Sequence, residues 1–190
     1  MNSAVLSLGS NMGDRQVNIK TALDALSALP DTGGVRVSKI YETRPEGYAD
    51  QPLFLNAAAV IQTELSPRAL LGACLGIEAA MGRVRNFKNG PRIIDIDLLV
   101  YEGETGNDLE LTLPHPRMSN RDFVLIPLAD LFPDGNVLGL DFKNAIAKAK
   151  NKSDNFITVY CEAANAVNDP ATSIKTAIPA IIGFLMFFIL

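Results

Sequence analysis

Histidine, cysteine and tryptophan are scarce in this sequence, and their scarcity excludes several kinds of site. His115 is the only histidine, which excludes an HExxH metalloprotease and leaves one candidate base for a Ser-His-Asp triad. The two cysteines, Cys74 and Cys161, form no CxxC pair, so the chain offers neither a zinc site nor a disulfide framework. Tryptophan is absent altogether.

Other common signals are missing as well. Neither GxxxxGK[ST] nor GxGxxG occurs, so a nucleotide would have to be bound by another device. No basic region precedes the apolar run at residues 3–9, and we therefore expect no signal peptide and a cytoplasmic location. The formal net charge of −4 argues against nucleic-acid binding by overall charge.

The 190 residues, 48% of them hydrophobic, suggest one globular domain with an added tail. Periodicity and turn signals predict strands, helices and loops along the chain. The predicted strands are 3–9, 35–41, 54–64, 90–101, 109–113 and 156–160; the helices follow Asp14 and Ser66 and span 142–152; the loops are 31–34 and 42–53. The order strand–helix–strand–strand–helix–strand predicts an α+β fold, a ferredoxin-like antiparallel sheet with helices on one face.

Two aspartates interrupt the most strand-like segment, GPRIIDIDLLVY at residues 90–101. Alternate side chains of a strand share a face, so Asp95 and Asp97 point one way and the apolar residues around them point the other. A buried carboxylate needs a cation or a proton, and two carboxylates at this spacing can converge on magnesium. The alternative is two aspartates on the solvent face of an edge strand.

A basic stretch directly precedes the aspartates. Residues 83–92 contain no acidic side chain and four basic ones, Arg83, Arg85, Lys88 and Arg92. Arginine forks suit phosphate oxygens, and the glycine and proline here indicate a loop rather than a helix face. The stretch therefore predicts phosphate binding, against the alternative of a solvated loop.

Aromatic and basic residues elsewhere leave two interpretations open. His115 lies between two prolines and is either a structural hydrogen-bonding residue or, with Arg121, a phosphate ligand. Phe54 and Phe123 are either core residues or two rings that clamp a flat substrate, with Asn56 bonding to its edge.

The chain resembles the 6-hydroxymethyl-7,8-dihydropterin pyrophosphokinases of folate biosynthesis, in order from about residue 4 to residue 134. The segments that carry the resemblance are GSNMGDR, YETRPEG with DQPLFLNAA, IEAAMGRVR, GPRIIDIDLLVY and LPHPRMSNRDFVLIPL. The aspartate strand and the PH…R.F segment are its most specific parts. The resemblance implies a ferredoxin-like fold and transfer of pyrophosphate from ATP, with two Mg²⁺ ions, to the hydroxymethyl group of the pterin, releasing AMP.

The resemblance also implies roles for individual residues. Asp95 and Asp97 match the metal ligands, and with Arg83 and Arg92 they are the expected catalytic residues. The positions expected to contact ATP are Glu78, Arg85, Arg92, Leu98, Thr112, His115 and Arg121. The positions expected to line the pterin are Thr43, Arg44, Glu46, Phe54, Asn56, Asp95 and Phe123. The expected partners are small molecules, ATP and the pterin, with no nucleic acid, and we expect a monomer.

The sequence departs from the family pattern at several positions. Asn89 stands where some members have a tryptophan that closes the site, and Phe87 is a candidate substitute. Pro116 stands where many have tyrosine, while Leu75 and Glu110 replace a glutamine and a basic residue that can serve ATP. These departures bear on nucleotide affinity and closure. They motivate the alternative of a non-catalytic protein that binds pterin or nucleotide.

Residues 176–190, TAIPAIIGFLMFFIL, form an uncharged C-terminal tail. As a helix it would extend about 22 Å, short of a roughly 30 Å hydrocarbon core. It is a shallow membrane contact, a strip docked on the domain or on a partner, or the product of a gene-model error. We therefore divide the chain into a pyrophosphokinase-like domain at 1–165 and a linker with an apolar tail at 166–190.

Overall fold

The computed structural model describes residues 1–85, 87–152 and 157–161. The predicted apolar tail and the boundary at residue 165 lie outside these residues. The elements are β1 (Asn2–Ser10), α1 (Arg15–Ser27), β2 (Thr32–Val37), β3 (Ile40–Thr43), β4 (Phe54–Thr63), α2 (Pro67–Ala80), β5 (Asp95–Tyr101), β6 (Gly106–Asn107), β7 (Thr112–Leu113), η1 (Met118–Asn120), α3 (Asp122–Leu131), β8 (Asn136–Val137), β9 (Leu140–Asp141), α4 (Lys143–Asn151) and β10 (Ile157–Cys161). None of the helices in the described ranges is long and apolar enough to cross a membrane.

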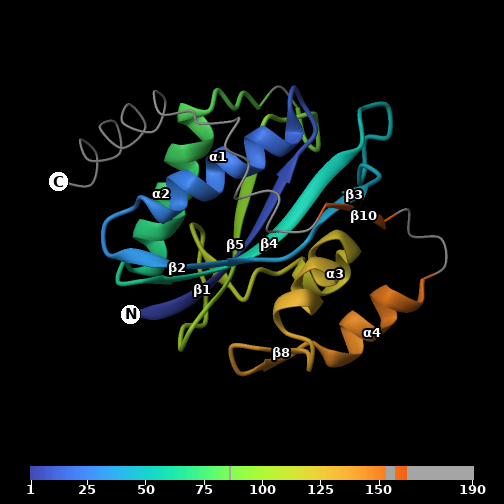
Figure 1. Ribbon diagram of the computed structural model, residues 1–190. Helices are drawn as coiled ribbons and strands as arrows, with labels where there is room; N and C mark the ends of the chain where they lie inside the picture. The colour runs from blue at the N-terminus through green and yellow to red at the C-terminus, as the bar shows by residue number, and fades with distance from the viewer. Residues whose placement is uncertain (86, 153–156, 162–190) are drawn as a thin grey trace.

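One antiparallel sheet organises the molecule (Figure 1). Its strands follow the order β10-β3-β4-β1-β5, with β2 also pairing with β4. All of these pairings are antiparallel. Strand β1 thus lies between β4 and β5, as the predicted ferredoxin-like arrangement requires.

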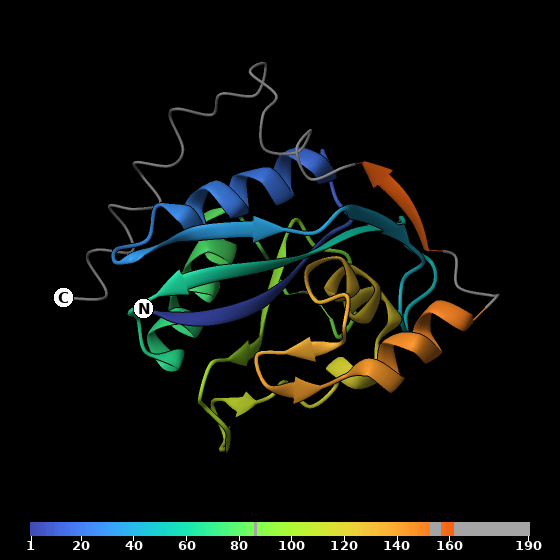
Figure 2. The ribbon, with the colours of Figure 1, turned by 60° about the horizontal axis from the view of Figure 1, so that its bottom comes forward.

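Helices cover both faces of this sheet, whereas the sequence pattern predicted helices on one face only (Figure 2). Helices α1 and α2 pack on the face that carries Leu6 and Leu8 of β1. Helix α3 packs on the opposite face, against Val5 and Val60. Strand β4 is buried at every position except Gln62, and a strand with two apolar faces must be covered twice.

The ends of the first two helices follow the sequence signals. The Asp14 carboxylate accepts a hydrogen bond from the Val17 N–H (3.1 Å) at the start of α1. The Ser66 hydroxyl accepts one from the Ala69 N–H (3.3 Å) at the start of α2, where Pro67 is the first helical residue. Gly82, with φ +84°, follows the end of α2 and adopts the left-handed conformation that glycine favours.

Four predicted segments differ from the structure. The strand predicted at 90–101 begins only at Asp95, the first residue of β5. The strand predicted at 35–41 is divided, because the Ser38 hydroxyl accepts the Ala58 N–H (2.9 Å) and the register slips by one residue between β2 and β3. The loop predicted at 31–34 joins β2 instead, where the Thr32 and Thr63 hydroxyls lie 2.8 Å apart. The strand predicted at 109–113 is reduced to β7, because the Asp108 carboxylate accepts two backbone N–H groups and turns the chain.

Candidate active site

Polar residues of β4, β1 and β5 lie next to one another on the face of the sheet that α3 partly covers. They line a hollow in that face. Gly9 of β1 pairs with Asn56 of β4 and with Asp95 of β5, while Ser7 pairs with Asp97. Small residues on the central strand leave space between longer side chains on its neighbours. A Cβ at position 9 would lie 2.9 Å from Asn56 Oδ1, so a side chain at this position would force Asn56 to move.

Two hollows open from this point and share one wall. The first is lined by Ser7, Gly9, Thr43, Arg44, Glu46, Phe54, Asn56 and Phe123. The second is lined by the basic loop and Arg117: Arg83, Val84, Arg85, Phe87, Lys88, Gly90, Pro91 and Arg117. The residues that line both are Asn89, Arg92, Asp95, Asp97 and Arg121. The two carboxylates therefore lie where the hollows meet.

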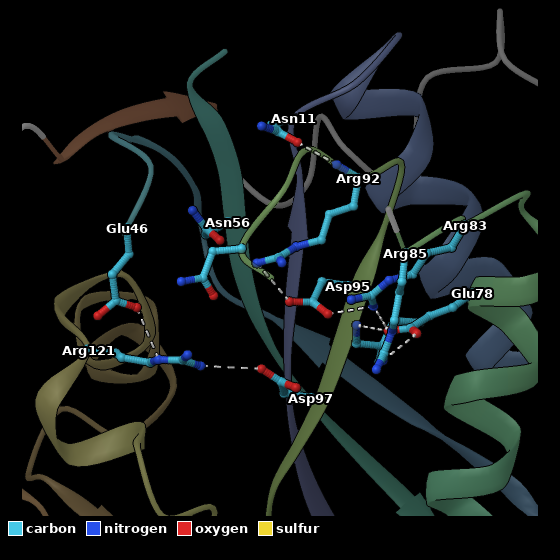
Figure 3. A network of polar contacts seen from close by, with 12 residues as sticks. Asn11, Glu46, Asn56, Glu78, Arg83, Arg85, Arg92, Asp95, Asp97 and Arg121 are labelled. Carbon is cyan, nitrogen blue, oxygen red and sulfur yellow. Dashed lines mark hydrogen bonds and ion pairs between the residues drawn. The ribbon is translucent and has the colours of Figure 1, made fainter. Parts of the chain in front are cut away.

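Three arginines neutralise the two aspartates (Figure 3). Asp95 forms ion pairs with Arg83 and with Arg92, whose Nη2 lies 3.1 Å from Asp95 Oδ2. Asp97 Oδ2 lies 3.6 Å from Arg121 Nη1. The Nε atoms of all three arginines are buried and have no hydrogen-bond partner among the residues that the structure describes.

Glu78 anchors the basic loop to the sheet from the last turn of α2. Its Oε1 accepts the Ile96 N–H (2.7 Å) and pairs with Arg83, which therefore bridges Glu78 and Asp95. The side chains of Glu78 and Arg83 are 5% and 8% exposed. Two arginines, Arg83 and the more exposed Arg85, thus offset the charge of one buried carboxylate.

Burial perturbs the titration of this cluster. It raises the pKa of Asp97, with a further rise from the nearby Asp95 charge that His115 and Arg121 oppose. It also raises the pKa of Glu78, while the Ile96 N–H and Arg83 act in the opposite direction. Burial lowers the pKa of His115 and favours its neutral imidazole.

The two predicted clamp rings both face the first hollow. The guanidinium of Arg92 lies 5.1 Å from the centre of the Phe54 ring, and that of Arg121 lies 5.4 Å from the Phe123 ring. Asn56 is buried and donates to the Thr43 hydroxyl (2.7 Å). The rings and the amide thus surround one space, as a flat polar heterocycle requires.

Other predicted residues lie outside the two hollows. Leu98 is buried in the core beneath α1 and α2. The Thr112 hydroxyl bonds to Asn107 Oδ1 (3.1 Å) on the short hairpin of β6 and β7. His115 is held beside β5 by its N–H bond to the Leu99 carbonyl (2.8 Å), and its Nδ1 accepts the Arg117 N–H (3.3 Å). Roles for these three in binding ATP stay predictions.

Two residues that sequence reasoning missed, Asn11 and Gln51, fasten the loops that flank the site. The Asn11 side chain accepts the Arg92 N–H (2.8 Å) and donates to Gln51 Oε1 (2.9 Å). Gln51 Nε2 in turn donates to the Asn89 carbonyl (2.9 Å). The ring of Phe87 packs edge-on against Tyr48 at 5.2 Å, so the loops also touch through aromatic residues. The GSN turn was the only sequence signal for Asn11.

Replacing Asn11 by alanine is expected to lower the free energy of unfolding by about 2 kcal/mol, because the Arg92 N–H and Gln51 lose buried partners. Urea unfolding measures this change, and faster hydrogen exchange of the Arg92 amide localises it. Asn107→Ala is the control, since Asn107 is exposed and its loss should cost less than about 0.5 kcal/mol. Equal costs for both variants would contradict the assignment of Asn11 as a fastening residue.

The residues present fit magnesium only when a ligand supplies part of its coordination. No group of three His, Cys, Asp or Glu side chains gathers within the described part of the chain. Magnesium is commonly held by one or two carboxylates together with substrate phosphates and water. Asp95 and Asp97 meet that pattern, provided that a phosphate chain enters the basic hollow.

Comparison with known proteins identifies the family of this sequence. The family model for 7,8-dihydro-6-hydroxymethylpterin-pyrophosphokinase (HPPK) matches residues 5–133. The chain is 49% identical over 148 residues to the 2-amino-4-hydroxy-6-hydroxymethyldihydropteridine pyrophosphokinase of Methylorubrum extorquens, covering 78% of this chain and 94% of that protein. It is 48% identical over 130 residues to the Pseudomonas aeruginosa protein of the same name, covering 68% and 80%.

Solved structures agree on the fold. Plasmodium falciparum HPPK-DHPS with pteroate gives a TM-score of 0.60 at 20% identity. The match covers 77% of this chain and 42% of that one, so this chain spans less than half the length of HPPK-DHPS. The matched family model and the two bacterial relatives decide the assignment: this chain belongs to the 7,8-dihydro-6-hydroxymethylpterin-pyrophosphokinase family.

Proposed function

We propose that this chain transfers pyrophosphate from ATP to the hydroxymethyl group of 6-hydroxymethyl-7,8-dihydropterin, as the family description and the names of its relatives indicate. The hydroxymethyl oxygen bonds to the β-phosphorus of ATP while the bond from that phosphorus to the oxygen of the α-phosphate breaks. AMP leaves, and the hydroxyl proton is released. Such a reaction depends on alignment and charge neutralisation more than on covalent chemistry by the protein.

One observation supports this proposal above the others: two hollows of different chemistry meet at Asp95 and Asp97. One hollow is flanked by aromatic rings and an amide, and the other by basic side chains. A pterin in the first and a triphosphate in the second would bring the hydroxymethyl oxygen and the β-phosphorus together beside the carboxylates.

The basic hollow suits the phosphate chain. Arg83, Arg92 and Arg121 each carry a buried Nε without a hydrogen-bond partner in the described structure. Phosphate oxygens would accept from these donors and offset the cost of their burial. We assign Arg83 and Arg92 to the charge that develops on the transferred group, and Arg85, Glu78 and Arg121 to binding the nucleotide or holding its ligands.

The first hollow suits the pterin. We propose that Phe54 and Phe123 stack on the two faces of its ring system and that Asn56 hydrogen-bonds to its polar edge. Thr43 holds the Asn56 amide in place through its hydroxyl. Arg44 and Glu46 line the loop side of this hollow.

We propose that Asp95 and Asp97 hold two Mg²⁺ ions together with the ATP phosphates. When bound, magnesium neutralises charge on the phosphate oxygens and helps to hold the attacking and leaving oxygens in line. To serve as ligands, both carboxylates must exchange their arginine partners, and those arginines are then free to turn toward phosphate oxygens. Burial raises the pKa of Asp97 and so disfavours the ionised carboxylate. A bound cation would offset this effect.

The test is formation of AMP from Mg-ATP, with and without 6-hydroxymethyl-7,8-dihydropterin. AMP that depends on the pterin, accompanied by pyrophosphorylated pterin, is the expected result. ADP and inorganic phosphate as products would instead mean attack at the γ-phosphorus. Binding of both ligands without AMP would overturn the proposal and favour a non-catalytic binding protein.

We propose that the catalytic unit ends near residue 165. Strand β10 pairs with β3 up to Cys161, and β3 in turn carries Thr43 of the site. A chain that ends at residue 165 is therefore expected to keep its kcat for AMP formation. A chain that ends at residue 152 loses β10 and should unfold at lower urea concentration, because β3 becomes an unpaired edge. Loss of activity in the chain that ends at residue 165 would mean that residues beyond 165 contribute to catalysis.

A further inference from the structure

Glu46 has a contact that its place in the pterin-lining loop does not require. Its Oε2 lies 3.3 Å from Arg121 Nε, across the gap between loop 44–53 and the start of α3 (Figure 3). On the other side, Nη1 of Arg121 faces Asp97 at 3.6 Å. Arg121 thus lies between two carboxylates, one on each side of the point where the hollows meet.

The two contacts of Arg121 differ in environment. The Arg121 side chain is 11% exposed and Asp97 is 32% exposed, whereas Glu46 is 58% exposed. Arg121 Nε, although close to Glu46, lacks the alignment of a hydrogen bond and has no such partner among the described residues. Glu46 therefore holds Arg121 by charge alone, and it can return to water when the pair breaks.

Any anion that enters the basic hollow meets Arg121, one member of this pair. Arg121 lines both hollows, and a phosphate oxygen is a stronger partner for a guanidinium than a misaligned, solvated carboxylate. Both carboxylates reduce the positive potential that Arg121 offers to a phosphate. Asp97 is a proposed metal ligand, whereas lining the pterin hollow does not require Glu46 to pair with Arg121.

We propose that Glu46 is a positioning residue that competes with nucleotide phosphates for Arg121 and thereby weakens nucleotide binding. This inference rests on the proposed function for the identity of the nucleotide. Because Glu46 belongs to loop 44–53, exchange of its partner by a phosphate also releases that loop from the start of α3. The phosphate site and the pterin-lining loop are thus linked through one ion pair, and the linkage acts in both directions.

The experiment measures the Kd of α,β-methylene-ATP with Mg²⁺ by titration calorimetry for the full chain and for Glu46→Gln. Removal of the competing charge should tighten binding about three- to fivefold. Glu64→Gln is the matched control, because it removes the same charge from an exposed side chain (62%). Glu64 follows the last residue of β4, whereas Phe54 of the site is the first residue of that strand. The control should therefore leave the Kd unchanged. Adenosine has no phosphate, so its Kd should be the same for the full chain and for Glu46→Gln.

A double-mutant cycle separates competition from a general disturbance of the loop. In an Arg121→Ala background, Glu46→Gln should no longer change the Kd of the ATP analogue, because no guanidinium remains to compete for. The inference would be overturned if Glu46→Gln alone left the affinity for the ATP analogue unchanged or weakened it. It would also be overturned if Glu46→Gln tightened binding equally in the parent protein and in Arg121→Ala. These measurements need no turnover, so binding without AMP formation would overturn only the proposed function. A chain that binds no ATP analogue would overturn both.

Discussion

Replacing Asp97 by asparagine is expected to lower kcat for AMP formation about 1,000-fold, because the proposed cation site loses one of its two carboxylates. Asparagine keeps the shape of the side chain and a carbonyl oxygen, so the hollow itself should persist. The measurement is steady-state AMP formation at saturating Mg-ATP and pterin. Asp108→Asn, at an exposed carboxylate on the hairpin between β5 and α3, is the control and should keep full activity. A kcat within tenfold of the parent protein would remove Asp97 from the metal site.

The same variant should be more stable than the parent protein at neutral pH. Burial and the Asp95 charge raise the pKa of Asp97 in the folded state, so the folded protein loses stability as pH rises through that pKa and the carboxylate ionises. Asparagine cannot ionise and avoids this loss. We expect a gain of about 1 kcal/mol at pH 8 and a smaller difference at pH 4, where the raised pKa leaves less of Asp97 ionised in the folded protein.

Urea unfolding of the two proteins at both pH values, without magnesium, measures this difference. A variant that loses activity while gaining stability would identify Asp97 as a residue retained for function at a cost in stability. A variant that is less stable at pH 8 than at pH 4, relative to the parent, would show that the Arg121 pair outweighs the burial of the carboxylate.

Replacing Arg92 by lysine is expected to lower kcat about 100-fold, although the charge is kept. Arg92 is the arginine whose guanidinium meets Asp95 (3.1 Å) and also lies over the Phe54 ring (5.1 Å). An ammonium group is a point charge that cannot make a bidentate contact with phosphate or stack on a ring in the same way. The loss should therefore fall on the transition state, where charge moves between phosphate oxygens.

Arg36→Lys on β2 is the matched control, because Arg36 is exposed and lies outside both hollows. It should change kcat by less than twofold, in keeping with the small effects of most surface substitutions. If Arg92→Lys raises only the KM for ATP and leaves kcat unchanged, then Arg92 contributes uniform binding and not catalysis.

The sequence predicted the framework that carries the site. Apolar periodicity located β1, β4 and the two helices that follow them, and the caps Asp14 and Ser66 were read correctly because capping depends on neighbours in the chain. The alternation of strand side chains placed Asp95 and Asp97 on the face opposite Ile96, which is buried under α1 and α2. The resemblance to the family supplied the candidate residues for that face.

The sequence failed where distant contacts override local preference. The sequence predicts Ser38 as an ordinary strand residue. In the structure its hydroxyl accepts a hydrogen bond from the Ala58 N–H, and the strand is interrupted there. Asn11 reads as part of a turn, yet its side chain joins β1 to two loops through Arg92 and Gln51. The covering of both sheet faces was also missed, since a buried strand does not reveal which helix lies over each side.

By itself, the sequence located β1, β4, α1 and α2 and showed which side chains of a strand share a face, because these depend on backbone preferences and on periods of two and 3.6 residues. Only the tertiary structure decided that Asp95 and Asp97 lie where two hollows meet, and that Glu46 faces Arg121. Both results follow from pairing β1 with β4 and β5 and from the placing of α3 across the sheet. Such contacts join residues far apart in the chain, so no local pattern encodes them.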